Sequence, residues 1–239
     1  MDQPRIYIPI STPALSFAAG ILRQSGILPA GCAEDADYLL YPSPTPLNAM
    51  EDYCHGATVI GGNLDFLNSC VPRIDLLKDP YYLAHNAAIT AEAALGLILS
   101  RMPCAITDGE ILILGWGRIG KCLTHQLAHL NAPLSVFARR PEDRAMLRAL
   151  GYTPIDPESL SGALSRFRCI VNTVPAPVLS QADEQQISED CYKLDLASVC
   201  CLPGSNAHHA KGLPGKYKPE SSGKLIANTI LHHIGGEKT

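Results

Sequence analysis

Residues 111–120 read Ile-Leu-Ile-Leu-Gly-Trp-Gly-Arg-Ile-Gly, a short apolar run followed by three glycines with the spacing G-x-G-x-x-G. Apolar residues then recur at helical spacing, with Leu123 and Leu127 on the same face as Ile119. A strand, a tight glycine turn and a helix in this order are typical of a dinucleotide-binding βαβ unit. A plain glycine-rich turn that holds no ligand is the alternative.

Each glycine of this turn has a specific expected role. Gly115 permits the tight turn, Gly117 lets a pyrophosphate approach the backbone, and Gly120 lets the helix pack close to the strand. The phosphates would accept hydrogen bonds from the free N–H groups at the helix N-terminus, where the helix dipole favours negative charge. The expected pyrophosphate-binding residues are Gly115, Trp116, Gly117, Arg118, Ile119 and Gly120.

The end of the next strand, expected over residues 134–138, decides which nucleotide binds. An NAD enzyme places an acidic residue there on the adenosine ribose. This sequence has Ala138-Arg139-Arg140 instead, and two guanidinium groups suit the 2′-phosphate of NADP. The sequence therefore favours NADP over NAD, with Ala138, Arg139 and Arg140 as binding residues. The alternative is that both arginines are ordinary surface residues at the start of a helix.

Two further strands, expected over residues 169–172 and 192–197, end at the same edge of the sheet. Ligands of open α/β sheets bind at the carboxyl ends of the strands. We therefore expect Thr173 near the ribose or pyrophosphate, and Ser198 or Asp195 near the nicotinamide. These residues could equally be turn or cap residues. The remaining cofactor-binding candidates at this edge are Asn172, Val174 and Pro175.

Alternation of strands and helices extends to both sides and predicts an α/β protein, with a Rossmann-type doubly wound parallel sheet and a smaller N-terminal α/β domain. The smaller domain is expected over residues 1–88 and is completed by a C-terminal helix at 221–234. A linking helix is expected over 89–105, and the dinucleotide-binding domain over 106–220. Within the smaller domain, strands are expected near residues 5–10, 37–41 and 57–60.

Composition narrows the function classes. The chain of 239 residues is 46% hydrophobic, with a formal net charge of -4, so it carries no basic field for nucleic acid. No apolar stretch reaches the length of a membrane span. The nine cysteines are an odd number without a C-x-x-C pair, so we expect neither a disulfide framework nor a metal site. We expect a soluble cytoplasmic protein.

Several segments together resemble the family of the dipicolinate synthase A subunit. They are the glycine turn, Asn172–Ala176, Leu194–Ser198, Gly212-Leu213-Pro214-Gly215-Lys216-Tyr217-Lys218-Pro219, Ser222–Asn228, and Asn86 with Thr90-Ala91-Glu92. The resemblance covers the chain from about residue 81 onward and, more loosely, residues 37–43, and the Gly-Leu-Pro-Gly segment is its most specific part. The N-terminal region is shorter than in the family. Residues 199–211 are also abbreviated, so we expect a strand at the sheet edge to be short or missing.

The resemblance implies an oxidoreductase that uses NADP to oxidise a dihydrodipicolinate-type precursor to dipicolinate during sporulation, together with a flavoprotein-like B subunit. Two substrate carboxylates call for cationic or N–H donors. Lys216, expected in a loop facing the crevice, would serve with the substrate-binding candidates Asn86, Thr90 and Gly215. Glu92 could act as a base, although a glutamate in a first helical turn also stabilises the helix dipole. The catalytic candidates are Glu92, Lys216 and Asp195.

Two other functions stay open. One is a stand-alone NADP-dependent reductase of a small oxo or imino acid, and the other is a catalytically inactive nucleotide-binding regulatory protein. None of the eight histidines stands out as an acid–base group, which argues against an ordinary 2-hydroxyacid dehydrogenase. The apolar linking and C-terminal helices leave room for a homodimer.

Overall fold

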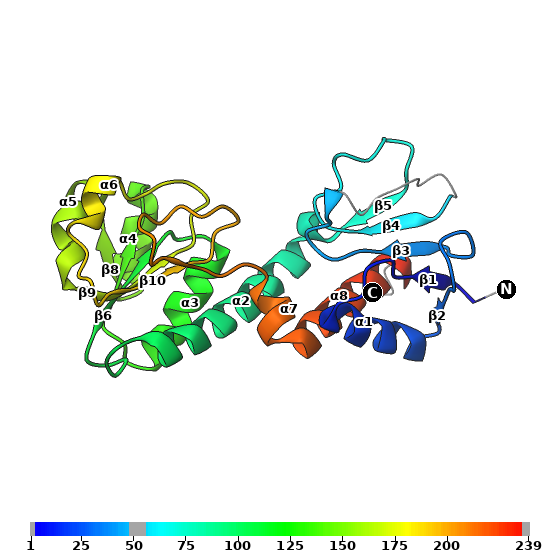
Figure 1. Cartoon of the computed structure of the whole chain (residues 1–239), viewed down its shortest axis with the longest axis horizontal. Helices are drawn as coiled ribbons and strands as arrows, with labels where there is room; N and C mark the ends of the chain where they lie inside the picture. Colours follow the sequence, from blue (N-terminus) through cyan, green and yellow to red (C-terminus); the bar gives the residue numbers. More distant parts are fainter. Residues whose placement is uncertain (1–2, 48–55, 236–239) are drawn as a thin grey trace. The chain divides into compact units, whose positions relative to one another are not determined.

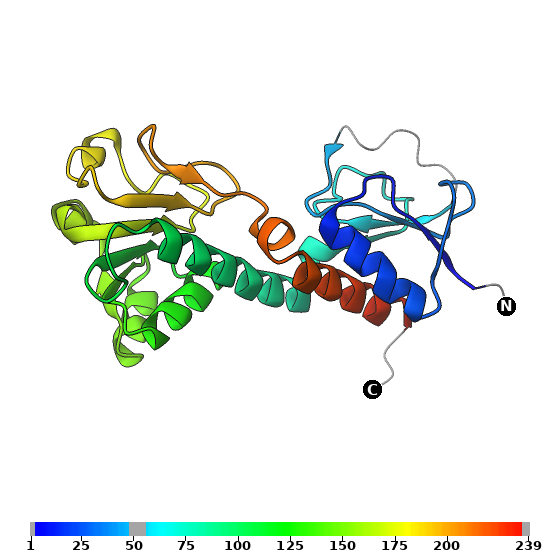
Figure 2. The ribbon, with the colours of Figure 1, turned by 60° about the horizontal axis from the view of Figure 1, so that its bottom comes forward.

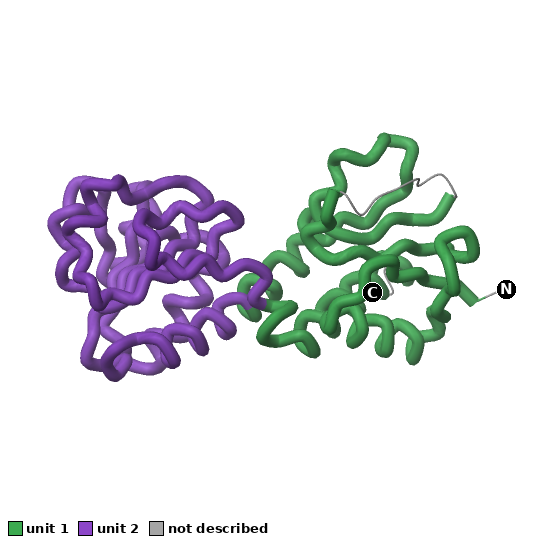
Figure 3. Tube along the Cα trace, in the orientation of Figure 1, with its two compact units in different colours: residues 1–89, 214–239 green, residues 90–213 purple. Residues whose placement is uncertain are grey.

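The computed structural model describes residues 3–47 and 56–235. It contains two compact units, shown in two colours in Figure 3. Unit 1 comprises Met1–Ile89 together with Pro214–Thr239, and unit 2 comprises Thr90–Leu213. The chain therefore enters unit 2 once and returns, so unit 1 is built from both ends of the sequence.

Unit 1 contains a sheet of five parallel strands in the order β2-β1-β3-β4-β5. The strands are β1 (Arg5–Tyr7), β2 (Leu28–Pro29), β3 (Tyr38–Leu40), β4 (Thr58–Gly61) and β5 (Arg73–Asp75). A short 3-10 helix, η2 (Leu76–Lys78), follows β5. Successive residues of β3 and β4 point to opposite faces, because Leu40 and Ile60 belong to one buried cluster and Leu39 and Val59 to another.

Two helices cover one face of this sheet. They are α1 (Pro13–Gln24) and α8 (Pro219–Gly235), which lie side by side in Figures 1 and 2. The Thr12 hydroxyl caps α1 by accepting a hydrogen bond from the Leu15 N–H at 3.2 Å, and Pro13 occupies the first helical position. Leu15 and Leu22 of α1 and Ile226 and Ile230 of α8 pack into the same apolar core.

The linking helix α2 spans Pro80–Arg101, so the expected range of 89–105 was wrong at both ends. The helix begins early because the Asp79 carboxylate accepts a hydrogen bond from the Tyr82 N–H at 2.8 Å, and Pro80 is favourable at the first helical position. Residues up to Ile89 belong to unit 1 and those from Thr90 to unit 2. Asn86 therefore lies within the helix rather than ahead of it.

Unit 2 contains six parallel strands in the order β11-β10-β9-β6-β7-β8. They are β6 (Glu110–Leu114), β7 (Leu134–Phe137), β8 (Thr153–Ile155), β9 (Phe167–Asn172), β10 (Tyr192–Asp195) and β11 (His208–His209). The chain moves from β6 outward to β8 and then from β9 outward to β11. This reversal between β6 and β9 is the topological switch point of a doubly wound sheet, so the predicted fold class is confirmed.

Helices and loops cover both faces of the second sheet. They are α3 (Arg118–His129), α4 (Pro141–Ala149), α5 (Pro157–Ala163), η3 (Leu164–Arg166) and α6 (Gln181–Glu184). The short helix α7 (Leu213–Tyr217) begins at the last residue of unit 2 and otherwise belongs to unit 1. Ile111 and Ile113 of β6 face a core that includes Ile98 of α2 and Leu123 of α3, whereas Leu112 and Leu114 face the opposite core. Both faces of β6 are buried, as its unbroken apolar sequence requires.

The edge strands β2, β8 and β11 are short, and the sequence did not reveal β2 and β8. Strands β2, β8 and β11 have only two or three residues, and two of them include a proline. The two-residue β11 is the short edge strand expected from the abbreviated segment 199–211. Lys216 lies in the short helix α7 rather than in the expected loop, so that expectation is corrected.

Candidate nucleotide site

The glycine turn joins β6 to α3 at the switch point of the second sheet. Gly115 has φ +106°, a conformation that glycine adopts at little cost. A Cβ at Gly120 would lie 2.2 Å from the Gly115 carbonyl oxygen, so only glycine allows α3 to approach the turn this closely. A Cβ at Gly117 would meet nothing within 4 Å. The backbone at Gly117 is therefore open on the side where a ligand could approach.

The N-terminus of α3 is available to an anion. Gly117 is its cap residue and has no side chain that could accept a hydrogen bond from the first turn. The first turn of a helix contains N–H groups without intrahelical acceptors, and the helix dipole adds a partial positive charge there. Arg118 is exposed next to Gly117. This combination fits a pyrophosphate group, as the sequence predicts.

Trp116 and Ile119 support the turn from the side of the protein. The indole ring of Trp116 lies 6.0 Å from the ring of Tyr152 in an edge-on arrangement, and the Lys121 Nζ lies 5.8 Å from the same ring. Ile119 packs against the apolar core shared with α2. Both side chains hold the turn in place, so contact with a nucleotide would come from the backbone around them.

The turn after β7 separates the roles of the two arginines. The Arg140 Nε and Nη2 donate to the two Asp143 carboxylate oxygens at 2.8 and 3.0 Å. Arg139 is exposed, and its guanidinium has no hydrogen-bond or ion-pair partner within the described part of the chain. Arg139 is thus free to receive a phosphate, whereas Arg140 would first have to release Asp143. Ala138 is buried at the end of the strand.

Sequence reasoning missed Arg144 and Asp143. The Arg144 Nη1 donates to the carbonyl oxygens of Ala138 and Arg139 at 2.9 and 2.7 Å, which fixes the backbone of this turn. Asp143 and Arg144 lie three and four residues after Arg140, on the same side of the first helical turn. That spacing of opposite charges was the signal that could have identified the pair.

The loop after β9 is fastened to the glycine turn. The Thr173 hydroxyl donates to the Leu114 carbonyl at 2.9 Å, and a Cβ at Gly115 would lie 2.6 Å from Val174 Cγ2. The Asn172 side chain is buried; its Nδ2 donates to the Val174 carbonyl and to Asp195 Oδ1 at 3.0 and 3.1 Å. Pro175 follows as an exposed residue. The geometry therefore gives Asn172 and Thr173 positioning contacts within the protein.

Asp195 does not fit the expected catalytic role. Its side chain is 0% exposed, and besides Asn172 it accepts hydrogen bonds from the N–H groups of Ala197, Cys201 and Leu202 at 2.7–2.9 Å. Four donors converge on one carboxylate, so Asp195 holds the turn after β10. We assign it a structural role in place of the catalytic one. Ser198, on this turn, is exposed.

A histidine also supports this turn, which the sequence did not suggest. The His209 Nε2 lies 3.0 Å from the Ala197 carbonyl oxygen, so the ring donates from this nitrogen. The neighbouring His208 pairs with the Tyr192 hydroxyl at 2.7 Å. Burial lowers the pKa of His208. Two adjacent histidines on the edge strand were the available signal, and His55 lies outside the described residues.

The expected substrate residues belong to different units. Asn86, Gly215 and Lys216 are in unit 1, whereas Thr90 and Glu92 are in unit 2. Thr90 is buried, and Glu92 and Lys216 are exposed. Their roles in binding a substrate stay predictions.

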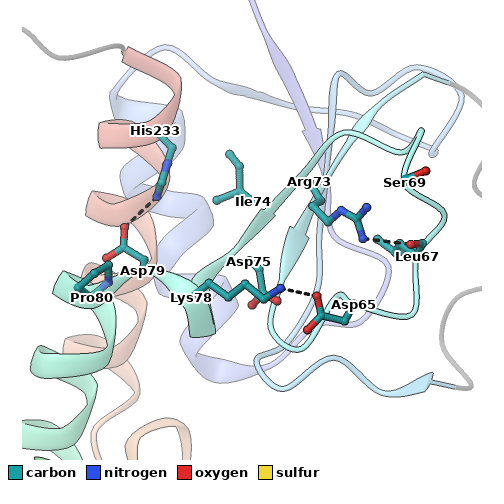
Figure 4. A pocket seen from close by; sticks show the side chains of 10 residues that line it. All are labelled: Asp65, Leu67, Ser69, Arg73, Ile74, Asp75, Lys78, Asp79, Pro80 and His233. Carbon is teal, nitrogen blue, oxygen red and sulfur yellow. Dashed lines mark hydrogen bonds and ion pairs between the residues drawn. The ribbon is translucent and has the colours of Figure 1, made fainter.

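Unit 1 has a pocket of its own, of about 690 Å³, beside the edge strand β5 (Figure 4). Its polar side chains are already paired with other groups of the protein. Lys78 pairs with Asp65, and the His233 Nε2 donates to Asp79 Oδ2 at 2.8 Å. The Arg73 Nη1 donates to the carbonyl oxygens of Leu64 and Leu67 at 2.9 and 3.1 Å. None of the residues predicted for a site lines this pocket.

Among the described residues, no group of three or more His, Cys, Asp or Glu side chains could hold a metal ion. The eight described cysteines are free, and Cys54 lies outside the described residues. α2 is the one described helix with the length and composition of a membrane span, although Ala94 and Ile98 of this helix pack into the core of unit 2.

Comparison with known proteins supports the resemblance. No family model matches the chain. Over 154 residues it is 27% identical to the A subunit of dipicolinate synthase from Bacillus subtilis (strain 168), and the match covers 61% of this chain and 52% of that protein. It thus spans about half the length of this curated relative. As its motifs predict, the chain is similar in sequence to the A subunit of dipicolinate synthase.

Solved structures agree on the fold. The A subunit of dipicolinate synthase from Bacillus halodurans superposes with a TM-score of 0.82 at 18% identity, covering 98% of both chains. A transhydrogenase from Sinorhizobium meliloti follows at 0.72 and 14% identity, covering 96% of this chain and 93% of the other. At these identities the likeness concerns the fold, a Rossmann-type α/β architecture.

Proposed function

We propose that this protein is an oxidoreductase that uses a nicotinamide dinucleotide and acts as the A-type subunit of a dipicolinate synthase. The glycine turn at the switch point is the observation that carries the proposal. It combines an uncapped helix N-terminus, an open backbone at Gly117 and two glycines that cannot carry a side chain. A glycine turn of this kind occurs in many dinucleotide-binding proteins. The sequence similarity to the A subunit of dipicolinate synthase supports the choice of this particular reaction.

NADP is the proposed cofactor. The N–H groups at the start of α3 would hold the pyrophosphate, and the free Arg139 guanidinium would hold the 2′-phosphate through charge-assisted hydrogen bonds. The turn after β10, fixed by Asp195 and His209, would shape the nicotinamide side of the site. When bound, the nicotinamide supplies a hydride acceptor.

The proposed substrate is a dihydrodipicolinate-type dicarboxylate. Its oxidation gives an aromatic ring, which provides much of the driving force, so the protein mainly has to orient the substrate. Lys216, Asn86, Thr90 and the backbone at Gly215 are the proposed carboxylate ligands, and Glu92 is the proposed base for a ring proton. A flavoprotein-like B subunit is the proposed partner. Cytoplasmic location and a homodimer are further expectations.

Thermal unfolding with and without nucleotide tests the proposal. Ligand at about a hundredfold above its dissociation constant adds about 2.7 kcal/mol to the unfolding free energy. We expect a clear increase in melting temperature with NADP, a smaller one with NAD, and loss of the NADP effect in Arg139→Ala. Arg148→Ala, which changes an exposed arginine in the last turn of α4, is the matched control. An unchanged melting temperature with both nucleotides would contradict the proposal.

A nucleotide-binding protein without turnover is the second candidate. It is favoured by the burial of Asp195, which leaves Glu92 and Lys216 as the remaining acid–base candidates. An assay of the purified protein with a dihydrodipicolinate-type substrate and NADP, with and without the proposed partner, separates the two. Nicotinamide reduction that is lost in Glu92→Gln or Lys216→Met supports catalysis. Tight nucleotide binding without reduction supports the second candidate.

A further inference from the structure

Asp143 lies next to the turn at which a dinucleotide-binding fold usually contacts the adenosine ribose. It is in the first turn of α4, which starts directly after the Arg139-Arg140 turn at the end of β7. Arg144 holds the backbone of that turn through the carbonyl oxygens of Ala138 and Arg139. The turn and the first helical residues therefore form one fixed frame, and Asp143 belongs to it.

Two cations act on the Asp143 carboxylate. The hydrogen bonds from Arg140 lower the pKa of Asp143 and outweigh the effect of burial, and the positive charge of Lys121 lowers it further. Lys121 also lies 5.8 Å from the Trp116 ring, next to the glycine turn. Asp143 thus neutralises positive charge from both elements that would surround the adenosine ribose. Its side chain is 21% exposed, whereas that of Arg140 is 71% exposed, so the guanidinium stays accessible from solvent.

A 2′-phosphate needs the same donors that Asp143 already uses. A phosphate on the ribose would have to displace the carboxylate from Arg140 or bind beside it against like-charge repulsion. A ribose 2′-hydroxyl has no such conflict, because it can donate a hydrogen bond to a carboxylate. Arg139 and Asp143 therefore act in opposite directions, the first toward NADP and the second toward NAD.

Resting on the proposed nucleotide site, we propose that Asp143 is a specificity-determining residue that weakens the preference for NADP by occupying Arg140. The dinucleotide-binding motif does not include Asp143, because the motif concerns the end of the strand and Asp143 lies beyond it. It reaches the turn through its bidentate contact with Arg140. The site is consequently able to accept both nucleotides, with the balance set by one carboxylate.

Asp143→Asn tests this inference, because it keeps the shape of the side chain and removes its charge. Binding is measured by titrating NADP and NAD while following the fluorescence of Trp116, the one tryptophan in the sequence, which lies in the glycine turn. We expect NADP to bind about tenfold more tightly in the variant, a change on the order of one hydrogen bond gained. NAD should bind no better than before, so the ratio of the two dissociation constants shifts about tenfold.

Two controls identify the mechanism. Glu142→Gln removes the same charge one residue away, where no hydrogen bond to Arg140 exists, and should leave the ratio within about twofold. The double variant Arg140→Gln with Asp143→Asn should lose most of the gain in NADP affinity. Asp143→Ser repeats the test with a second uncharged side chain, and the melting temperature without ligand checks that each variant is folded.

The outcomes separate the two proposals. If the wild-type protein binds a nucleotide but the ratio is unchanged in folded Asp143→Asn, the role of Asp143 is wrong and the proposed function stands. The same conclusion follows if Glu142→Gln shifts the ratio equally. If the wild-type protein binds neither nucleotide, the proposed function fails and the specificity role fails with it.

Discussion

Gly117 and Gly120 lie three residues apart in the same turn, yet a methyl group added to each would meet different surroundings. At Gly120 it would lie 2.2 Å from the backbone oxygen of Gly115, and at Gly117 it would point into open space. The fold requires a glycine at position 120. At position 117 the glycine is required only by the ligand of the proposed function. The pair therefore separates stability from binding.

Gly120→Ala should lower the unfolding free energy by about 1–3 kcal/mol, because the turn or α3 must shift to accept the methyl group. Gly117→Ala should cost less, about 0.5–1 kcal/mol, because its φ of -82° suits any residue and only the poorer capping by alanine counts against it, but it should weaken nucleotide binding. Denaturant unfolding and nucleotide titration of both variants measure this. Wild-type affinity in Gly117→Ala would show that the ligand does not approach this backbone.

The buried Asp195 carboxylate should contribute to the stability of unit 2. In the wild type, the N–H groups of this turn donate to both carboxylate oxygens of Asp195. Asparagine has only one acceptor oxygen, so some of these buried N–H groups would lose their partner. Asp195→Asn should therefore lower the unfolding free energy by about 2–3 kcal/mol. Asp190→Asn, at an exposed carboxylate, is the matched control and should cost less than about 1 kcal/mol. Equal stability of the two variants would return Asp195 to the list of catalytic candidates.

The pairing of α1 with α8 depends on close contact between their backbones. A Cβ at Gly223 of α8 would lie 2.4 Å from the Ala14 carbonyl oxygen and 3.0 Å from the Ala18 nitrogen of α1. The sequence gives no hint of this, because a glycine inside a helix usually only weakens it. Here the missing side chain allows two helices from opposite ends of the chain to share one apolar core.

Gly223→Ala should therefore lower the unfolding free energy by about 1–3 kcal/mol, despite the better helix propensity of alanine. Gly96→Ala is the matched control, since a Cβ at that position in α2 meets nothing within 4 Å. It should raise the unfolding free energy by about 0.5–1 kcal/mol. A stabilising effect of Gly223→Ala would mean that the two helices are further apart than described.

The contact between Asp79 and His233 connects the start of α2 with the last turn of α8 and predicts a pH dependence. Burial alone would raise the pKa of Asp79, but hydrogen bonds from the Tyr82 N–H and from His233 outweigh it and lower the pKa below its ordinary 3.8. A lowered carboxyl pKa stabilises the folded state above the ordinary value, and this stability is lost as the pH falls through the folded pKa.

Asp79→Asn should consequently reduce the unfolding free energy at neutral pH and have a smaller effect well below pH 3.8. Denaturant unfolding of the variant and of the wild type at several pH values measures the difference. Asp65→Asn, at an exposed carboxylate, provides the comparison for a generic loss of charge. A cost that does not change with pH would mean that the carboxylate charge of Asp79 is unimportant.

The two sheets were predictable to different degrees. The second sheet follows from the glycine turn and from short unbroken apolar runs such as Ile111–Leu114, which are typical of strands buried on both faces. Strands such as Leu28–Pro29 carry too few residues for any pattern, and the Gly-Leu-Pro-Gly segment indicates a turn although α7 begins at Leu213. The glycine turn was found from the sequence, whereas Asp143, Arg144 and the burial of Asp195 depend on contacts that form only in the fold.

Nucleotide binding should protect one unit more than the other. In hydrogen exchange with NADP present, we expect slower exchange at the start of α3 and in the turn after β7, because the ligand would cover these N–H groups. The pocket beside β5 in unit 1 serves as the internal comparison (Figure 4). Protection around Arg73–Asp79 and none at the glycine turn would place the nucleotide in the wrong unit for the proposed function.

The division of unit 1 between the two ends of the chain has a consequence for biosynthesis. Leu225, Ile226 and Ile230 of α8 complete the core beneath β1, β3 and β4. The chain is synthesised from its N-terminus, so all of Thr90–Leu213 is made before α8, and unit 2 has all of its residues before unit 1 does. Until α8 arrives, the apolar face of α1 lacks its partner, and the nascent chain exposes that face for as long as synthesis of the intervening unit takes.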